Sequence, residues 1–323
     1  MTYSAMIDIS IVIPVYRSQQ SLRELYQRLI RVLTVQKLSF EILFVEDCGE
    51  DNSWAVIQEL CVADSRIIGI RMSRNYGQHN ALLAGIRSAK GQNIATLDDD
   101  LQHSPEELPK LLSKLLGGYD VVYGSPKSEQ HGLLRNIASQ ITKIALKSAM
   151  GVDTARNVSA FRVFRTELRD AFSAYRSPSV NIDVLLSWAT TRFIAIQVEH
   201  KERKYGQSGY TARKLIRHSM NMMTGFSTLP LKLASYIGFL FSIFGMLVLV
   251  YVIGRYLLSG SVVPGFPFLA SIIALFSGAQ LLALGIIGEY LARMHQRSMD
   301  QAAYNICEIL RASLDTKQPS QPK

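Results

Sequence analysis

Apolar runs alternate with stretches of helical periodicity along the first 125 residues. Each run is short, rich in Ile, Val, Leu or Phe and closed by a polar turn, which is the pattern of strands buried on both faces. Strands are predicted at residues 9–13, 40–45, 67–70, 93–97 and 121–123. Helices are predicted at residues 22–32, 53–62 and 78–89, and from Pro105 onward, with residues 51–53 and Ser104 as caps. This alternation predicts an α/β fold with a mostly parallel sheet flanked by helices.

Two uncharged stretches, residues 233–254 and 268–288, follow this region. Each is about 20 residues long, enough for a helix to cross a hydrocarbon core of about 30 Å. The short linker between them predicts a transmembrane hairpin, while two buried core helices are the alternative. Arg255 is a weak exception that can snorkel to the interface.

Basic residues flank the outer ends of both stretches, including Lys232, Arg293 and Arg297. The positive-inside rule therefore predicts that these ends lie in the cytoplasm. The first ten residues are too polar for a signal peptide, which also favours a cytoplasmic α/β domain. The predicted parts are an α/β domain (residues 1–210), an amphipathic region (211–230), a transmembrane hairpin (231–292) and a cytoplasmic tail (293–323). The amphipathic region suits either the membrane surface or packing against the domain.

The net charge of +9 comes from 35 basic and 26 acidic residues. Either nucleic acid or an anionic bilayer could attract this excess. Because much of it borders the uncharged stretches and no aromatic-and-basic RNA-binding motif occurs, we expect a lipid bilayer and no nucleic acid. Cys48, Cys61 and Cys307 are scattered without zinc-ligand spacing, so free thiols in a reducing compartment are predicted.

Three successive carboxylates, Asp98 to Asp100, follow the predicted fourth strand, and Gln102 lies two residues further on. Carboxylates this close repel one another unless a cation offsets their charge. In a parallel sheet, ligands bind beyond the carboxyl ends of strands, where Asp47 also follows the second strand. The pattern predicts a Mg²⁺ or Mn²⁺ ion that holds a diphosphate; a solvated acidic loop is the alternative.

The common glycine-rich nucleotide loops are missing from the sequence. No P-loop motif occurs, and the first strand leads into Pro14-Val-Tyr16 instead of a dinucleotide fingerprint. This disfavours P-loop kinases, ATPases and dinucleotide oxidoreductases. A nucleotide would have to be held by side chains, with a carboxylate such as Asp47 on the base or ribose.

Five segments together resemble glycosyltransferase family 2, which has a GT-A fold: IVIPVY, VEDCGEDNS, RNYGQHNALLAG, ATLDDDLQHSPEELP and GYDVVYG. The run ERKYGQSGY, followed by two apolar stretches, is similar to the polyprenyl-phosphate branch of that family. That branch includes dolichol-phosphate mannose synthase, the bactoprenol glucosyltransferases and the undecaprenyl-phosphate aminoarabinose transferase. The resemblance covers the chain to about residue 297 and implies a GT-A catalytic domain with a two-helix membrane anchor.

The resemblance also implies roles for matching residues. Pro14, Tyr16 and Asp47 would hold the nucleoside, and Asp98 and Asp99 the nucleotide. Asp98, Asp100 and Gln102 would bind the divalent metal. Arg135 and Arg203 would contact phosphate, and Ser208 belongs to the loop implied to close over diphosphate and acceptor. The residues implied to carry catalysis are Asp98, Asp100, Arg135 and Arg203.

Two positions depart from the pattern of the branch. Arg156 stands where an acidic residue is usual, with Asp153 as a nearby replacement, and Gly209 stands where a lysine is usual, with Lys204 as a substitute. A hydroxyl acceptor generally needs a general base, whereas a phosphate monoester, with a second pKa of about 6, is already ionised at neutral pH. Loss of the carboxylate therefore favours a phosphate acceptor.

These observations predict an inverting, metal-dependent hexosyltransferase-like enzyme at the inner membrane. It would move a sugar from a UDP- or dTDP-linked donor to undecaprenyl phosphate, for O-antigen or other cell-envelope glycan modification. Transfer to a hydroxyl of a lipid-linked glycan and a non-catalytic membrane scaffold are the alternatives. The sequence does not identify the sugar, the nucleotide or the oligomeric state, and a homo-oligomer is one option.

Overall fold

The computed structural model describes residues 7–126, 150, 157–201, 224–259, 265–299 and 301–311. The chain divides into two compact units. The first comprises Met1–Leu133, Met150–Thr211 and Asp300–Lys323, and the second Leu134–Ala149 and Ala212–Met299.

Within the described part of the first unit, eight strands form one mixed sheet in the order β7-β5-β6-β4-β1-β2-β3-β8. Strands β1, β2, β3 and β4 run parallel, as do β5 and β7, whereas β6 and β8 are antiparallel to their neighbours. The strands are β1 (Ile9–Val15), β2 (Phe40–Glu46), β3 (Ile67–Met72), β4 (Asn93–Thr96), β5 (Val121–Pro126), β6 (Arg162–Arg165), β7 (Phe193–Val198) and β8 (Ile306–Arg311).

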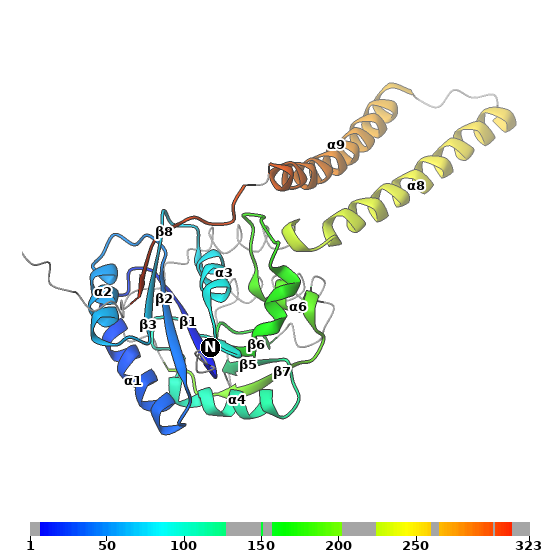
Figure 1. The fold of residues 1–323 in the computed structure, drawn as a ribbon. Helices are drawn as coiled ribbons and strands as arrows, with labels where there is room; N and C mark the ends of the chain where they lie inside the picture. The colour runs from blue at the N-terminus through cyan, green and yellow to red at the C-terminus, as the bar shows by residue number, and fades with distance from the viewer. Residues whose placement is uncertain are drawn as a thin grey trace, which may run out of the picture. The chain divides into compact units, whose positions relative to one another are not determined.

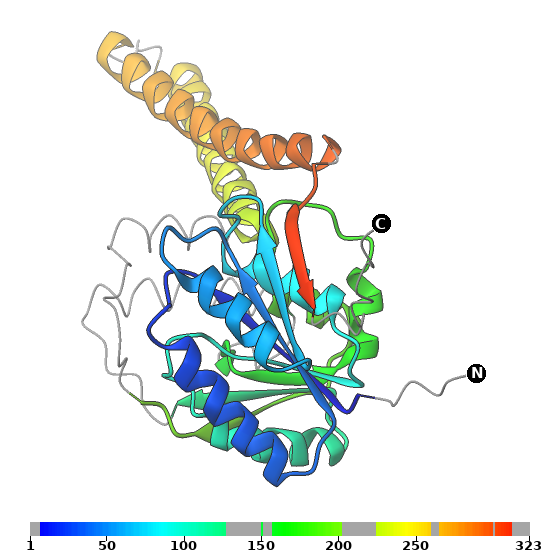
Figure 2. The ribbon, with the colours of Figure 1, turned by 60° about the vertical axis from the view of Figure 1, so that its left-hand side comes forward.

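Helices cover both faces of this sheet (Figures 1 and 2). One face carries α1 (Leu22–Val35), α2 (Ser53–Ala63) and α4 (Leu108–Leu116), and the other carries α3 (Gln78–Ser88) and α6 (Ile182–Ala189). Two 3₁₀ segments, η1 (Pro105–Glu107) and η3 (Thr166–Phe172), precede α4 and follow β6. The predicted α/β fold with a mostly parallel sheet is confirmed.

The period of two along β1 decides which helix each side chain meets. Ile9, Ile11 and Ile13 belong to the core shared with α1, α2 and α4. Val12 points the other way, toward Gly85 of α3, where a Cβ atom would clash with the valine side chain. Because glycine lets this helix approach the sheet closely, the pocket-forming start of α3 lies near the strand ends.

The strand β8 was not predicted from the sequence. Its side chains alternate between half-buried and exposed, as in an edge strand, but six residues with Cys, Glu and Arg among them gave no clear period. It lies beside β3 in both ribbon views and closes that edge of the sheet (Figures 1 and 2). Part of the predicted tail is therefore a strand of the α/β sheet.

Both predicted caps lie at the N-cap positions, although neither N-cap side chain makes a capping hydrogen bond. Asn52 occupies the N-cap of α2 without a side-chain capping bond, and Asp51 accepts the hydrogen bond from the Ser53 N–H instead. Ser104 precedes the 3₁₀ segment η1, and its buried hydroxyl makes no hydrogen bond with any described residue.

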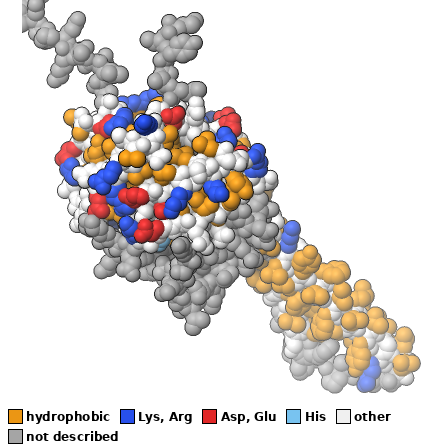
Figure 3. Space-filling view, turned by 90° about the horizontal axis from the view of Figure 1, so that it is seen from below, with side chains coloured by type: hydrophobic (Ala, Val, Ile, Leu, Met, Phe, Trp, Pro, Cys, Tyr) orange, Lys and Arg blue, Asp and Glu red, His pale blue; other side chains and the backbone are white. Residues whose placement is uncertain are grey.

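The second unit contains two long apolar helices, α8 (Leu229–Ser259) and α9 (Gly265–Ser298). Both are long and apolar enough to cross a membrane, and hydrophobic side chains dominate their surface (Figure 3). Their bases are joined by polar contacts, since the Tyr290 hydroxyl donates to the Ser227 carbonyl at 2.6 Å. Near the middle, the Phe276 ring packs on Gly245. The predicted helical hairpin is confirmed, with longer helices than expected.

Candidate active site

A pocket of about 270 Å³ lies at the carboxyl ends of β1, β2 and β4. This is where ligands bind in open parallel sheets, because the loops diverge there. Its lining consists of Pro14, Tyr16, Asp47, Asn75, Gly77, Gln78, Asp98, Asp99 and Asp100. The structure therefore brings together six of the sequence-predicted site residues, which come from three separate strand ends.

Asp47 holds one wall of the pocket, which is formed by residues 73–77 and is called the 73–77 wall below. Its two carboxylate oxygens accept hydrogen bonds from the backbone N–H groups of Tyr76 and Gly77, both at 2.7 Å. Gly77 has a φ of 91°, which a residue with a Cβ atom adopts only under strain. The carboxylate thus holds residues 73–77, the segment between β3 and α3, in a conformation that glycine makes possible.

The acidic turn after β4 is held by different partners on each residue. Asp98 accepts a hydrogen bond from the Gln78 side-chain amide at 2.5 Å, and Asp99 accepts one from the Tyr16 N–H at 3.0 Å. Asp100 accepts one from the Gln102 N–H at 3.1 Å. The three neighbouring carboxylates are therefore aimed in different directions by the ends of β1, β4 and α3.

Three turns around the pocket share an unusual backbone conformation. Arg17, Cys48 and Leu101 have φ values of 55°, 55° and 63°, and each directly follows a lining residue. Non-glycine residues rarely occupy the left-handed region, and such positions concentrate at functional sites. The chain therefore turns sharply, in the same left-handed conformation, directly after Tyr16, Asp47 and Asp100.

Burial raises the pKa of two pocket carboxyls. For Asp99, loss of hydration and the charge of Asp100 raise the pKa to about 6, while hydrogen bonds from Ser18 and Tyr16 oppose the rise. For Asp47, burial raises the pKa against the two backbone N–H donors. In the absence of a cation, the pocket therefore disfavours additional negative charge.

The donor set fits a hard divalent ion that also binds a substrate. Among the described residues, no three or more His, Cys, Asp or Glu side chains form a metal-binding group. Asp98 and Asp100 do line one pocket, whereas Gln102 is not among its lining residues and reaches Asp100 through its backbone N–H. Mg²⁺ is typically held by one or two carboxylates together with substrate phosphates and water, so a protein-only cage is not required.

A buried polar network lies behind the acidic turn and was missed by sequence reasoning. Arg162 of β6 has a side chain only 2% exposed and forms an ion pair with Asp183 of α6. Its Nε donates to the Thr96 hydroxyl at 3.0 Å, and the Tyr123 hydroxyl donates to Asp183 at 3.0 Å. The signal available was a charged residue in the middle of the apolar run FRVF, which calls for a buried partner.

His103 joins this region to the segment after β7. Its ring packs against Phe161 and His200, with centroids 5.6 and 5.3 Å apart, and the Lys201 N–H donates to the Gln102 carbonyl at 2.9 Å. Burial lowers the pKa of His103 to about 4, with His200 adding to the effect, so the imidazole is neutral at pH 7. Gln102 and His103, two and three residues after Asp100, are therefore in contact with Lys201 and His200, which follow β7.

Several predicted residues lie outside the described part of the chain. These are Arg135, Arg156, Arg203, Lys204, Ser208 and Gly209, together with most of the amphipathic region. Their roles stay predictions.

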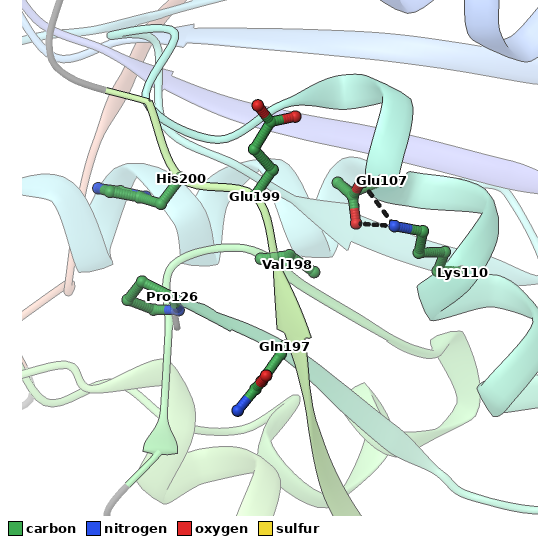
Figure 4. A pocket seen from close by; sticks show the side chains of 7 residues that line it. All are labelled: Glu107, Lys110, Pro126, Gln197, Val198, Glu199 and His200. Carbon is green, nitrogen blue, oxygen red and sulfur yellow. Dashed lines mark hydrogen bonds and ion pairs between the residues drawn. The ribbon is translucent and has the colours of Figure 1, made fainter. Parts of the chain in front are cut away.

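A second, larger cavity of about 580 Å³ lies between α4 and the ends of β5 and β7 (Figure 4). Its charged side chains include the ion pair of Glu107 and Lys110, whose atoms are 2.6 Å apart. The described lining consists of Glu107, Lys110, Pro126, Gln197, Val198, Glu199 and His200. None of the sequence-predicted site residues is among these, and two carboxylates against one lysine, which is already paired with Glu107, disfavour a diphosphate.

Comparison with known proteins identifies the family and similar relatives. Residues 10–173 match the family described as glycosyl transferase family 2. Two similar relatives are undecaprenyl-phosphate 4-deoxy-4-formamido-L-arabinose transferases. The one from Proteus mirabilis is 33% identical over 312 residues, covering 96% of each chain. The one from Pseudomonas syringae pv. syringae is 34% identical over 308 residues, covering 94% of this chain and 91% of the relative.

The fold also resembles solved structures. Glucosyl-3-phosphoglycerate synthase from Mycobacterium tuberculosis, in complex with Mn²⁺, uridine diphosphate and glucosyl-3-phosphoglycerate, aligns with a TM-score of 0.50 at 13% identity. The alignment covers 68% of this chain and 78% of that one. At this identity the likeness concerns the fold alone.

Proposed function

This chain belongs to glycosyl transferase family 2, and on that premise we propose that it is an inverting transferase that moves a sugar from a nucleotide-sugar to undecaprenyl phosphate. The nucleotide would be of the UDP or dTDP type. The product would serve cell-envelope glycan or lipopolysaccharide modification. The apolar hairpin and the lipid carrier in the relatives' names support action at the cytoplasmic face of the inner membrane.

The observation that carries this proposal is the convergence of Asp47 and the Asp98–Asp100 turn on one pocket at the strand ends. Asp98, Asp100 and Gln102 would hold Mg²⁺ or Mn²⁺, which when bound offsets the charge of a departing diphosphate. Pro14, Tyr16 and the wall fastened by Asp47 would enclose the nucleoside. Asp99 would keep the Tyr16 backbone in place.

An ionised phosphate acceptor suits the residues present. A phosphate monoester has a second pKa of about 6, so at neutral pH it attacks the anomeric carbon without losing a proton to the protein. The relatives named for undecaprenyl phosphate support this acceptor over a glycan hydroxyl. We propose that Arg135, Arg203 and Ser208 position the donor diphosphate and the acceptor phosphate by charge and hydrogen bonding.

The test compares Asp100→Ala with the intact chain in detergent containing Mn²⁺. Labelled donors, including UDP-4-deoxy-4-formamido-L-arabinose, UDP-glucose and a dTDP-sugar, are offered with a short polyprenyl phosphate or with a lipid-linked saccharide. We expect transfer to the phosphate only, and a loss of about a hundredfold or more in Asp100→Ala, as for other groups that stabilise transition-state charge.

Asp170→Ala is the matched control, because Asp170 is an exposed carboxylate of η3 that does not line the pocket. It should retain the rate of the intact chain. Turnover by Asp100→Ala equal to that of the control would contradict the metal assignment. Transfer to the saccharide hydroxyl alone would show that the acceptor is a glycan hydroxyl and not a polyprenyl phosphate.

A further inference from the structure

The chain segment after α9 returns to the strand that leads into the pocket. β8 pairs with β3 from Ile68, opposite Arg311, to Met72, opposite Ile306. One residue further, the Ser73 N–H donates to the Asn305 carbonyl at 3.0 Å. Hydrogen bonding between the two segments therefore extends to the first residue of the 73–77 wall.

The same segment also touches the far end of α3. Ala303 is 4% exposed, and the Tyr304 ring lies 5.7 Å from the guanidinium carbon of Arg87. Arg87 stands in the last turn of α3 and donates to the carbonyls of Phe172 and Tyr175 at 3.2 and 2.6 Å. Residues 301–311 thus support both the beginning of the wall and the helix that follows it.

The 73–77 wall is held by hydrogen bonds at both of its ends. Asp47 holds Tyr76 and Gly77 near α3, while Asn305 holds Ser73 near β3. Between them lies Asn75, which lines the pocket. Without the Ser73 hydrogen bond, this end of the wall would be held only through Met72 and the pairing of β3 with β2, which ends at Arg71. Residues 73–75 would then gain conformations and could move away from the end of β2.

We propose that residues 301–311 are a positioning element of the donor site, which set the 73–77 wall against Asp47 and thereby raise affinity for the nucleotide. The proposal rests on the proposed function, in which this pocket takes a nucleotide-sugar. It gives the segment beyond the membrane hairpin a role in donor binding, distinct from acceptor binding.

The experiment uses the chain in detergent and two shortened forms, one ending at Asp300 and one ending at Arg311. Binding of UDP and of dTDP, each with Mn²⁺, is measured by calorimetry, and the KM values for donor and polyprenyl phosphate are measured by transfer. We expect the form ending at Asp300 to lose about tenfold or more in nucleotide affinity and to show a raised donor KM. Its kcat at saturating donor and its acceptor KM should stay within about twofold, because the loss is one of ground-state binding. The form ending at Arg311 should match the intact chain.

A second pair of variants tests the hydrogen bond itself. Ser73→Pro removes the N–H that donates to Asn305, whereas Ser73→Ala keeps it and removes only the hydroxyl. We expect weaker nucleotide binding in Ser73→Pro than in Ser73→Ala. A synthetic peptide of residues 301–311 should restore binding to the form ending at Asp300, which separates a missing strand from a misfolded domain.

Each outcome decides the matter. Nucleotide affinity equal to that of the intact chain in the form ending at Asp300 overturns the proposal. So does a parallel loss of donor and acceptor binding, with a lowered melting temperature, that the peptide does not restore, since the segment would then be structural only. If the intact chain itself binds neither nucleotide with Mn²⁺, the proposed function fails first.

Discussion

At the residue scale, the carboxyl groups of the pocket are in surroundings that disfavour their ionised form. Asp99 is the clearest case, because burial and the neighbouring Asp100 raise its pKa to about 6. Three left-handed residues add backbone strain around the same pocket. A bound cation would offset the cost of ionising Asp99, because its charge favours the ionised carboxylates.

The raised pKa of Asp99 predicts a pH-dependent stability of the metal-free protein. Since the folded carboxyl holds its proton up to a higher pH than the unfolded one, stability should fall as pH rises from about 4 to about 6, and then level off. Asp99→Asn should remove this fall and raise the free energy of unfolding at pH 7, by on the order of 1–3 kcal/mol. Thermal unfolding in EDTA between pH 4.5 and 7.5 measures the difference. Identical pH profiles for the two proteins would contradict it.

Gly77→Ala should weaken nucleotide binding. At a φ of 91°, alanine costs about 1–3 kcal/mol unless the backbone shifts, and a shift would pull the Gly77 N–H from Asp47. We expect about a tenfold loss of UDP or dTDP affinity in titrations with Mn²⁺.

Gly118→Ala provides the control for this change. Gly118 has a φ of 108° but follows α4, away from the pocket. It should lower the melting temperature and leave nucleotide affinity unchanged. Equal affinity losses in the two variants would show that strain anywhere in the domain, and not the wall itself, affects the pocket.

At the scale of the elements, the first five strands and the helices between them were predictable from the sequence. Runs such as residues 9–13 and 40–45 are mostly apolar and buried on both faces because helices cover both sides of the sheet, and their polar members Ser10 and Glu41 bond to each other. The strands β6, β7 and β8 were not predicted. Arg162 and Arg165 break the apolar run of β6, β7 follows the region in which strands and helices alternate in the sequence, and β8 is a polar edge strand. Their pairing partners lie far away in the sequence, where local patterns carry no information.

The same limit applies to the site. Asp47 and the Asp98–Asp100 turn were found because their residue types and places after strands point to one sheet edge. The contribution of Asn75, Gly77 and Gln78 depends on the path of the chain between β3 and α3, which only the fold defines. The ion pair between Arg162 and Asp183 requires a contact between β6 and α6 that no sequence spacing indicates.

That buried pair should be sensitive to loss of one partner. Arg162→Met or Asp183→Leu alone leaves an unpaired buried charge, and we expect each to lower stability by about 3–5 kcal/mol. The double variant should be less destabilised than either single one, because no charge is left unpaired. Melting temperatures of the three variants measure this coupling. A double variant that loses the sum of both single effects would contradict it.

At the scale of the whole molecule, the membrane hairpin interrupts the α/β domain in sequence. The sheet takes seven of its described strands from before α8 and one from after α9. With basic residues at the outer ends of both helices, the positive-inside rule predicts that these ends lie on the cytoplasmic side, as the proposed function requires.

This orientation can be tested through Cys307, which is exposed, whereas Cys61 is buried. In a Cys48→Ser background, a membrane-impermeant maleimide should label Cys307 in inverted inner-membrane vesicles and not in intact spheroplasts. The Cys307→Ser form of the same background is the control for labelling elsewhere. Labelling in intact spheroplasts would place the domain on the opposite side of the membrane.

The late position of β8 has a consequence for how the protein is made. More than 230 residues separate Met72 from its partner Ile306, and at about 5–20 residues per second a ribosome needs roughly ten to fifty seconds to synthesise them. Throughout that interval the outer edge of β3 has unpaired backbone groups, which can recruit strands from other nascent chains. A shortened protein that stops before the hairpin would keep this edge open permanently, and such a fragment is expected to aggregate through it.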